Sequence, residues 1–227
     1  MAYTERDYAT FLLKKNCADI VWSALAVFEN CSVTLAATKT IIEGFSVSGI
    51  TLNELTQVKN LGMGIEHLAE LLISNQFAFT NDVACHLHNI IERDRTLTKR
   101  KYALSINNSP STLSATKKPE KQWITAQKKI QDIIKSGDSM RASAEAFCQM
   151  VQSQFFTVNG RCTSWLMSLG ILVDAGIPPY ALDVRDKECF NITLTEMCRT
   201  ENSENMINLL YKHAGYTPKT GHHEQPF

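Results

Sequence analysis

The sequence has no excess charge of either sign, since its 23 lysine and arginine residues equal its 23 aspartate and glutamate residues. A strongly basic chain attracts nucleic acid and anionic membrane surfaces over long range, and this chain lacks such a field. We therefore expect no DNA or RNA partner, although a local basic cluster is compatible with the overall balance.

The sequence also lacks segments that direct a chain into a membrane. Its first residues, Met1–Tyr8, contain neither the cationic start nor the apolar stretch of a secretion signal. No apolar run reaches the roughly 18 residues that span a bilayer. We expect no membrane span and a location in the cytoplasm. Non-classical secretion into a host cell, as by a bacterial effector, would leave no such mark, so this alternative remains open.

The cysteines show no pairing pattern. They are odd in number, and no two stand at the C-x-x-C spacing of a zinc or redox motif. Most fall within apolar helical patterns, so we interpret them as buried reduced thiols in a reducing compartment, rather than as a disulfide framework or a zinc site. The seven are Cys17, Cys31, Cys85, Cys148, Cys162, Cys189 and Cys198.

Apolar residues are abundant enough for a core, at 44% of 227 residues against 20% charged residues. They recur at intervals of three and four along most of the chain, which predicts about nine helices and an all-α fold. We expect one helical stretch over the first thirty residues with a break at Asn16 or Cys17. The others are expected near 32–43, 51–72, 80–91, 122–136, 139–151, 161–176, 193–198 and 205–211.

Several helix ends can be predicted from their capping residues. Thr51 and Glu54 have the spacing of a capping box, in which each side chain accepts a backbone N–H of the first helical turn. Thr80 or Asn81 is expected to cap the following helix, and Ser139 a later one.

The helical pattern is interrupted between residues 93 and 120. A basic cluster over 93–101 is followed by a polar stretch over 107–119 that is rich in turn-forming residues. We predict a long surface loop with a short strand at 102–106, so that the fold contains at most one β-hairpin. The cluster is interpreted as a solvated part of the loop, with a phosphate-facing or partner-facing patch as the alternative.

Five segments follow one another in an order that is more informative than any one of them. They are Ile42–Gly44 with Thr51–Val58, then Asn60–Leu68, Leu87–Ile91, Gln152–Arg161 and Gly176–Pro179. In this order they resemble segments of the Fic/Doc (Fido) domain, over about residues 20 to 212. The fourth stands where that family has H-x-F-x-[DE]-G-N-G-R-x-x-R. The resemblance implies a Fic-like helical domain over 32–213, preceded by a helical segment over 1–31 and followed by a disordered tail over 214–227.

The family transfers AMP, or another phosphate-containing group, from a nucleotide such as ATP to a hydroxyl side chain of a protein. Phe155 matches the core phenylalanine of the motif, and Asn159, Gly160 and Arg161 match its N-G-R. A glycine turn that opens directly into a helix presents unpaired backbone N–H groups and the positive end of the helix dipole to an anion. These three residues are our candidate phosphate or nucleotide site. The alternative is a helix start capped by Asn159, with Arg161 in solvent.

Four positions of the motif differ from the family. Ser153 replaces the histidine that acts as catalytic base, and Thr157 replaces the acidic residue that holds magnesium. Val158 replaces a glycine, and Ser164 replaces the second arginine, which grips the terminal phosphate. General-base catalysis alone is worth about 10²–10⁴-fold in rate. We therefore assign no catalytic residue with confidence, and expect Mg²⁺ to lack its usual ligand.

A second motif of the family is also incomplete. Self-inhibited members carry [ST]-x-x-x-E-[GN], whose glutamate pairs with the second arginine. Glu43 and Gly44 are present here, but Lys39 occupies the serine or threonine position and the arginine is absent. Because Lys39 and Glu43 are four residues apart on a predicted helix, we expect them to pair with each other.

The remaining candidates for chemistry are weaker. His86 and His88 are two residues apart on a helix and should point in different directions, so we predict no metal site there despite the adjacent Cys85. His222, His223 and Glu224 lie in the predicted tail. Cys162 would begin a helix beside Arg161, where a thiol can become nucleophilic, but a structural role is favoured.

Three functions remain open from the sequence. The favoured one is a pseudoenzyme that keeps a phosphate-binding or nucleotide-binding loop and acts through a protein partner. The second is a divergent transferase with another base, for which Glu43, Asp138 and Glu145 are candidates. The third is an unrelated helical module that mimics the motif by chance.

Overall fold

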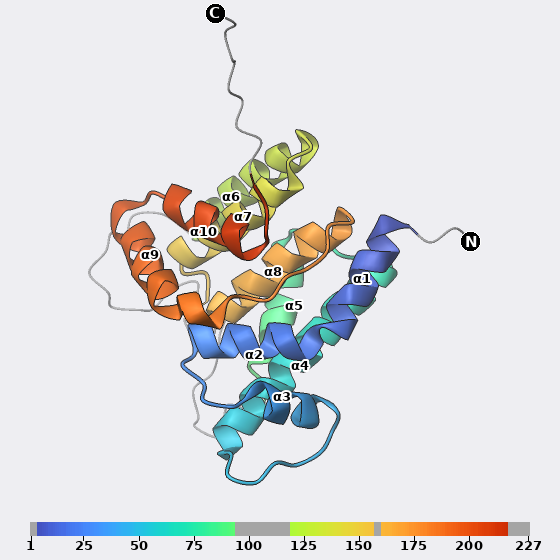
Figure 1. Ribbon diagram of the computed structural model, residues 1–227. Coiled ribbons are helices and arrows are strands. Elements are labelled where there is room, and N and C mark those ends of the chain that lie inside the picture. Colours follow the sequence, from blue (N-terminus) through green and yellow to red (C-terminus); the bar gives the residue numbers. More distant parts are fainter. Residues whose placement is uncertain (1–3, 94–118, 157–159, 218–227) are drawn as a thin grey trace, which may run out of the picture.

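Most elements of this fold are helices, as the apolar residues at intervals of three and four predict. The computed structural model describes residues 4–93, 119–156 and 160–217, and these contain ten α-helices and one 3-10 turn but no strand. The elements are α1 Glu5–Lys15, α2 Cys17–Phe28, α3 Leu35–Ile42, α4 Leu52–Ile73, α5 Asn81–Ile91, α6 Pro119–Lys135, α7 Ser139–Gln152, α8 Gly160–Asp174, η1 Val184–Asp186, α9 Lys187–Thr200 and α10 Glu204–His213 (Figure 1).

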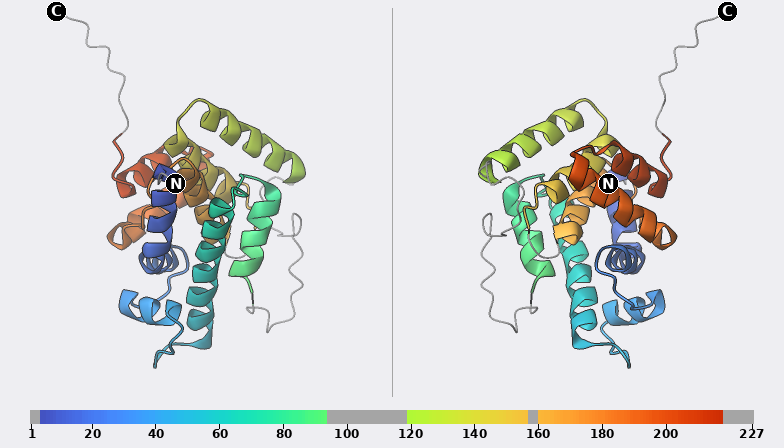
Figure 2. Two further views of the ribbon diagram at one scale, coloured as in Figure 1. Left: turned by 90° about the vertical axis from the view of Figure 1, so that its right-hand side faces the viewer. Right: turned by 90° about the vertical axis from the view of Figure 1, so that its left-hand side faces the viewer.

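Helix α8 is the centre of the molecule. Every residue from Cys162 to Val173 is buried, so this helix is covered on all sides. Helices α7, α5, α4, α1 and α2 pack around it (Figure 1). Figure 2 shows α4 and α5 side by side, with α6 crossing above α5.

Small side chains let the helices around α8 approach closely. A Cβ on Gly170 would lie 2.3 Å from the ring of Phe77, and one on Gly64 of α4 would lie 2.9 Å from Leu166. Between α7 and α8, the buried hydroxyls of Ser143 and Ser168 are 2.7 Å apart and hydrogen-bonded. These two buried hydroxyls therefore satisfy each other.

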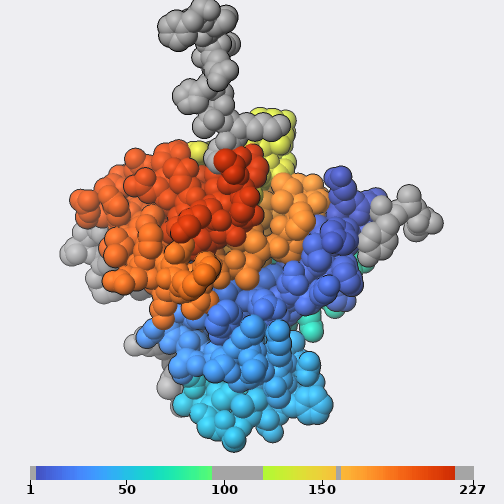
Figure 3. All heavy atoms as spheres, viewed as in Figure 1, coloured from blue at the N-terminus to red at the C-terminus, as the bar shows by residue number. Residues whose placement is uncertain are grey.

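The N-terminal helices belong to the same core. Buried Ala9, Leu13 and Ile20 join the continuous apolar cluster that includes the residues of α8. Arg6 of α1 pairs with Asp174 at 2.8 Å, which fixes α1 beside the end of α8. In the space-filling view, the blue residues of α1 and α2 lie along the orange residues of α8 (Figure 3). Helices α9 and α10 pack against α7, and α9 also contacts α2.

The predicted all-α fold is confirmed in the described residues, and most helix ends agree with the sequence. Asn16 separates α1 from α2, and Thr80 caps α5. The Thr51–Glu54 capping box is present in full. No helix among the described residues is long and apolar enough to cross a bilayer. The strand predicted at 102–106 and the tail from 218 onward lie outside the described residues.

Two boundaries were predicted wrongly. The N-cap of α7 is Asp138, which accepts the backbone N–H of Arg141, so Ser139 is instead the first helical residue. Helix α9 begins at Lys187, not near residue 193. Its buried residues Phe190, Leu194 and Met197 follow a helical spacing, and Phe190 extends the apolar face by one turn before the predicted start.

Candidate functional site

The motif loop connects the end of α7 to the start of α8. Ser153 forms the C-cap of α7, and Gln154 adopts a left-handed backbone conformation with φ of 48°. The chain then turns through Phe155 and Phe156 and enters α8 at Gly160. Thr157, Val158 and Asn159 lie outside the described residues, so the predicted role of Asn159 remains a prediction.

The two phenylalanines of the loop contact different parts of the core. Phe155 is buried and packs edge-on against Trp123 of α6, with ring centroids 4.8 Å apart; Trp123 in turn stacks on Phe79. Phe156 stacks on His88 of α5 at 4.2 Å. The described part of the loop, up to Phe156, is thus held from both sides by aromatic contacts.

His88 is a residue of this site that the sequence did not single out as functional. Its Nδ1 atom lies 2.9 Å from the hydroxyl of Thr163, in the first turn of α8. Burial lowers the pKa of His88 to about 4, because the charged imidazolium would lose its hydration. The ring is therefore neutral at pH 7. The only sequence signal was its place in the Leu87–Ile91 segment of the family resemblance.

Arg161 is tied to the end of another helix. Its Nη1 atom donates a hydrogen bond of 3.2 Å to the carbonyl oxygen of Phe28, the last residue of α2. The last carbonyls of a helix have no partner within it, and a positive charge is favourable there. Arg161 is therefore not simply in solvent, as one interpretation of the sequence had it.

Replacing Arg161 with alanine should lower the free energy of unfolding by about 1–2 kcal/mol, because a charged donor at the end of α2 is lost. Urea denaturation followed by circular dichroism measures this change. Arg185→Ala is the matched control, since the Arg185 side chain is 90% exposed. Equal stabilities for the two variants would contradict a role of Arg161 in holding α2.

The two serines at the altered motif positions have different surroundings. The Ser153 hydroxyl has no hydrogen-bond partner among the described residues, whereas a nucleophilic serine is activated by an adjacent base. Ser164 is only 1% exposed, and its hydroxyl donates to the carbonyl oxygen of Gly160 at 2.7 Å. This position faces the interior and leaves little room for a long side chain.

Asn60, at the start of another segment of the resemblance, is a structural residue. It is buried in α4 and its amide donates to the carbonyl oxygens of Ile91 and Arg93, the former at 3.1 Å. These bonds satisfy carbonyls at the end of α5 that have no partner within the helix. They hold the helix that carries His88.

The Lys39–Glu43 pair expected from the inhibitory motif does not form. The Lys39 ammonium instead lies 3.9 Å from the carboxylate of Asp19 on α2. Glu43 is the exposed C-cap of α3 and has no ion pair within the described part of the chain, and Gly44 follows it with φ of 93°. The helix ends at Ile42, and Glu43 lies just beyond it.

The other bases considered from the sequence are occupied or distant. Glu145 is buried and pairs with Lys129 at 2.9 Å and with Arg141 at 3.1 Å. Asp138 caps the start of α7, at the opposite end from Ser153. A helix of 14 residues separates them, which is about 21 Å.

No group of three or more histidine, cysteine or acidic side chains that could hold a metal is present in the residues that the structure describes. Cys162 is 1% exposed, so it is not an accessible nucleophile. His222, His223 and Glu224 lie outside the described residues.

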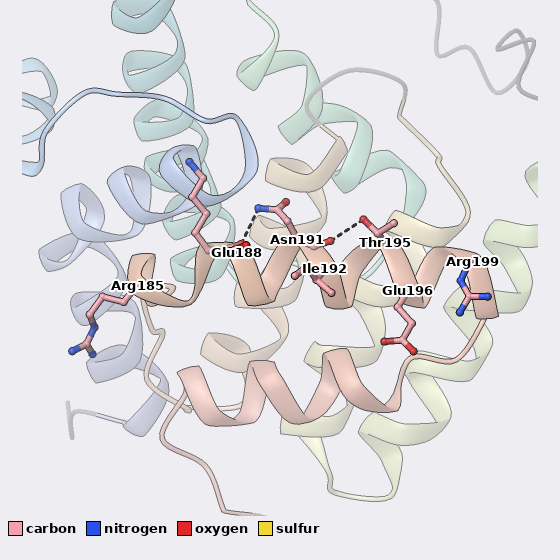
Figure 4. A pocket seen from close by; sticks show the side chains of 8 residues that line it. Arg185, Glu188, Asn191, Ile192, Thr195, Glu196 and Arg199 are labelled. Atoms are coloured by element: carbon pink, nitrogen blue, oxygen red, sulfur yellow. Dashed lines mark hydrogen bonds between the residues drawn. The ribbon is translucent and has the colours of Figure 1, made fainter.

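A shallow hollow of about 860 Å³ runs along the outer face of α9 (Figure 4). Ile192 is 62% exposed at its centre. Gln152, at the end of α7, donates to the carbonyl oxygen of Met197, so the motif loop begins next to this helix. The lining residues are Arg185, Lys187, Glu188, Asn191, Ile192, Thr195, Glu196 and Arg199.

The arrangement of helices is similar to solved structures of Fic proteins. Two structures of Fic-1 from C. elegans match with TM-scores of 0.70 and 0.69, at 17% and 16% identity, over 91% of this chain and 68% of theirs. A Fic family protein from Desulfovibrio desulfuricans G20 matches with a TM-score of 0.59 at 16% identity, over 89% of this chain and 64% of its own. No family model and no curated protein matches the sequence.

The chain therefore has the Fic fold. The fold that the ordered segments implied is confirmed, and the hypothesis of an unrelated helical module is wrong. At sequence identities this low, structural similarity establishes a shared fold but not a shared activity. Activity must therefore be argued from the residues of this chain.

Proposed function

We propose that this protein is a degenerate Fic-fold pseudoenzyme, which keeps a loop able to hold a phosphate or nucleotide and acts through contacts with a protein partner. The observation that carries this proposal is Ser153, whose hydroxyl has no partner among the described residues at the position where a Fic motif has its base. A serine without an activating base neither accepts nor supplies a proton near neutral pH.

The phosphate end of the site supports the same proposal. A side chain at position 164 would have to leave a buried position to reach a terminal phosphate, and the serine there is bonded to Gly160. Arg161 is engaged with α2. The threonine at position 157 supplies no charge for Mg²⁺. What remains for an anion is the start of α8, where the positive end of the helix dipole favours a negative charge.

Calorimetric titration with ATP, with and without Mg²⁺, tests the proposed loop. We expect weak binding that changes less than about twofold on adding Mg²⁺, because no acidic residue of the motif is present to hold the ion. Inorganic phosphate should compete, since backbone N–H groups recognise the anion and not the base. A tenfold or greater gain in affinity with Mg²⁺ would contradict the proposal.

One observation favours a second function, a divergent transferase that moves AMP or another phosphate-containing group to a protein hydroxyl. The neutral imidazole of His88 touches the motif loop, and its Nε2 atom has no hydrogen-bond partner in the described segments. However, a base with a pKa of about 4 accepts a proton poorly at pH 7. Transfer activity that is lost in His88→Gln but retained in His86→Gln would favour this alternative.

A further inference from the structure

Two histidines that are distant in the sequence meet on the surface of the molecule. His67 lies on α4 and His86 on α5, and their ring centroids are 4.5 Å apart with the ring planes inclined by 46°. The two helices run side by side here (Figure 2). The His67 side chain is 27% exposed and His86 belongs to the exposed residues, so solvent ions reach both rings.

The nitrogen atoms of this pair are available to a ligand. The Nδ1 atom of His67 lies 3.1 Å from a carboxylate oxygen of Glu70, which leaves its Nε2 atom free. Neither nitrogen of His86 has a hydrogen-bond partner within the described residues. A carboxylate on one imidazole nitrogen is the usual support of a metal bound at the other, because it fixes the tautomer and the ring orientation.

The spacing of the rings fits one shared ion. With a metal–nitrogen distance of about 2.1 Å, two imidazoles bound to the same ion have centroids roughly 5 Å apart. The observed separation of 4.5 Å is close to this value. Because no third histidine, cysteine or acidic ligand completes the group in the described residues, water would fill the remaining positions.

We propose that His67 and His86 form a two-histidine site for a divalent first-row transition ion, and that Glu70 positions the ring of His67. Imidazole ligands suit Ni²⁺, Cu²⁺ and Zn²⁺, and their affinity at a given site rises from Co²⁺ through Ni²⁺ to Cu²⁺. The ion would join α4 to α5, the helix that also carries His88. This site is independent of the proposed function of the motif loop.

The test is a calorimetric titration with Ni²⁺, which does not oxidise thiols. All proteins carry C189S, C198S, H222A and H223A, so that exposed thiols and the two histidines at 222 and 223 do not contribute. We expect one Ni²⁺ per chain, lost in His86→Ala and in His67→Ala. Glu70→Gln should weaken binding by about tenfold. The neighbouring Glu66→Gln is the matched control and should leave the affinity unchanged, because the Glu66 side chain makes no hydrogen bond or ion pair with His67 among the described residues.

A second measurement is independent of calorimetric heats. Saturating Ni²⁺ should raise the melting temperature of the background protein, because it binds the folded chain, and Cu²⁺ should do so at lower concentration. Because His86 is exposed, His86→Ala should fold normally and lose this shift. The proposal is overturned if the background protein binds no Ni²⁺, or if His86→Ala binds it as tightly, in which case the two rings make a packing contact only.

Discussion

The Trp165→Ala protein is expected to be less stable than the unsubstituted protein by about 3–5 kcal/mol. Trp165 is fully buried in α8, and its ring packs edge-on against Phe28, Phe147 and Tyr180, with centroids 5.1–6.3 Å away. Removing the indole leaves a cavity between helices that have little freedom to close it. Guanidinium denaturation followed by circular dichroism measures the loss.

Trp22→Ala is the matched control for this change. Trp22 lies on α2 and is partly exposed, so truncating it removes less buried surface and should cost less than half as much. If Trp165→Ala cost no more than Trp22→Ala, the helix that carries the motif loop would not be the centre of the core.

Stability is expected to fall as the pH is lowered from 6.5 to 4, by up to about 3 kcal/mol through His88 alone. In the unfolded chain this histidine takes up a proton near pH 6.5, whereas in the folded protein its pKa is about 4. The unfolded state therefore binds more protons within this window, and acid favours unfolding. Above pH 6.5 the contribution is present in full.

The variant His88→Gln should remove most of this dependence, because glutamine can still bond to Thr163 but does not titrate. Urea denaturation at a series of pH values measures the slope. Some dependence should remain, since burial also lowers the pKa of His213. A slope that His88→Gln leaves unchanged would contradict the buried, neutral state of His88.

The helices could be predicted from the sequence because their ends depend on residues that are close to one another in the chain. The break at Asn16 and the capping box of Thr51 and Glu54 are set by neighbours within four residues, and both formed as expected. The start of α9 was missed because a single residue, Phe190, carried the extra turn of its apolar face. A family resemblance spread over five ordered segments supplied the arrangement of the helices, which periodicity alone cannot.

The site was less predictable because its contacts join distant residues. Arg161 bonds to Phe28, and the rings of His67 and His86 meet across two helices. Lys39 pairs with Asp19 of α2, whereas the helical spacing indicated only Glu43, four residues further along the chain. The altered motif positions were visible in the sequence, but the burial of Ser164 became clear only with the helices in place.

The central claim is that a Fic fold is present here without the machinery for nucleotide transfer. Turnover of labelled ATP by the purified protein with Mg²⁺, followed as pyrophosphate release and as label on protein, tests this claim most directly. We predict a rate no different from that of the Ser153→Ala protein, because Ser153 contributes no base. Sustained turnover that Arg161→Ala abolishes would contradict the claim, since it would require a working phosphate site.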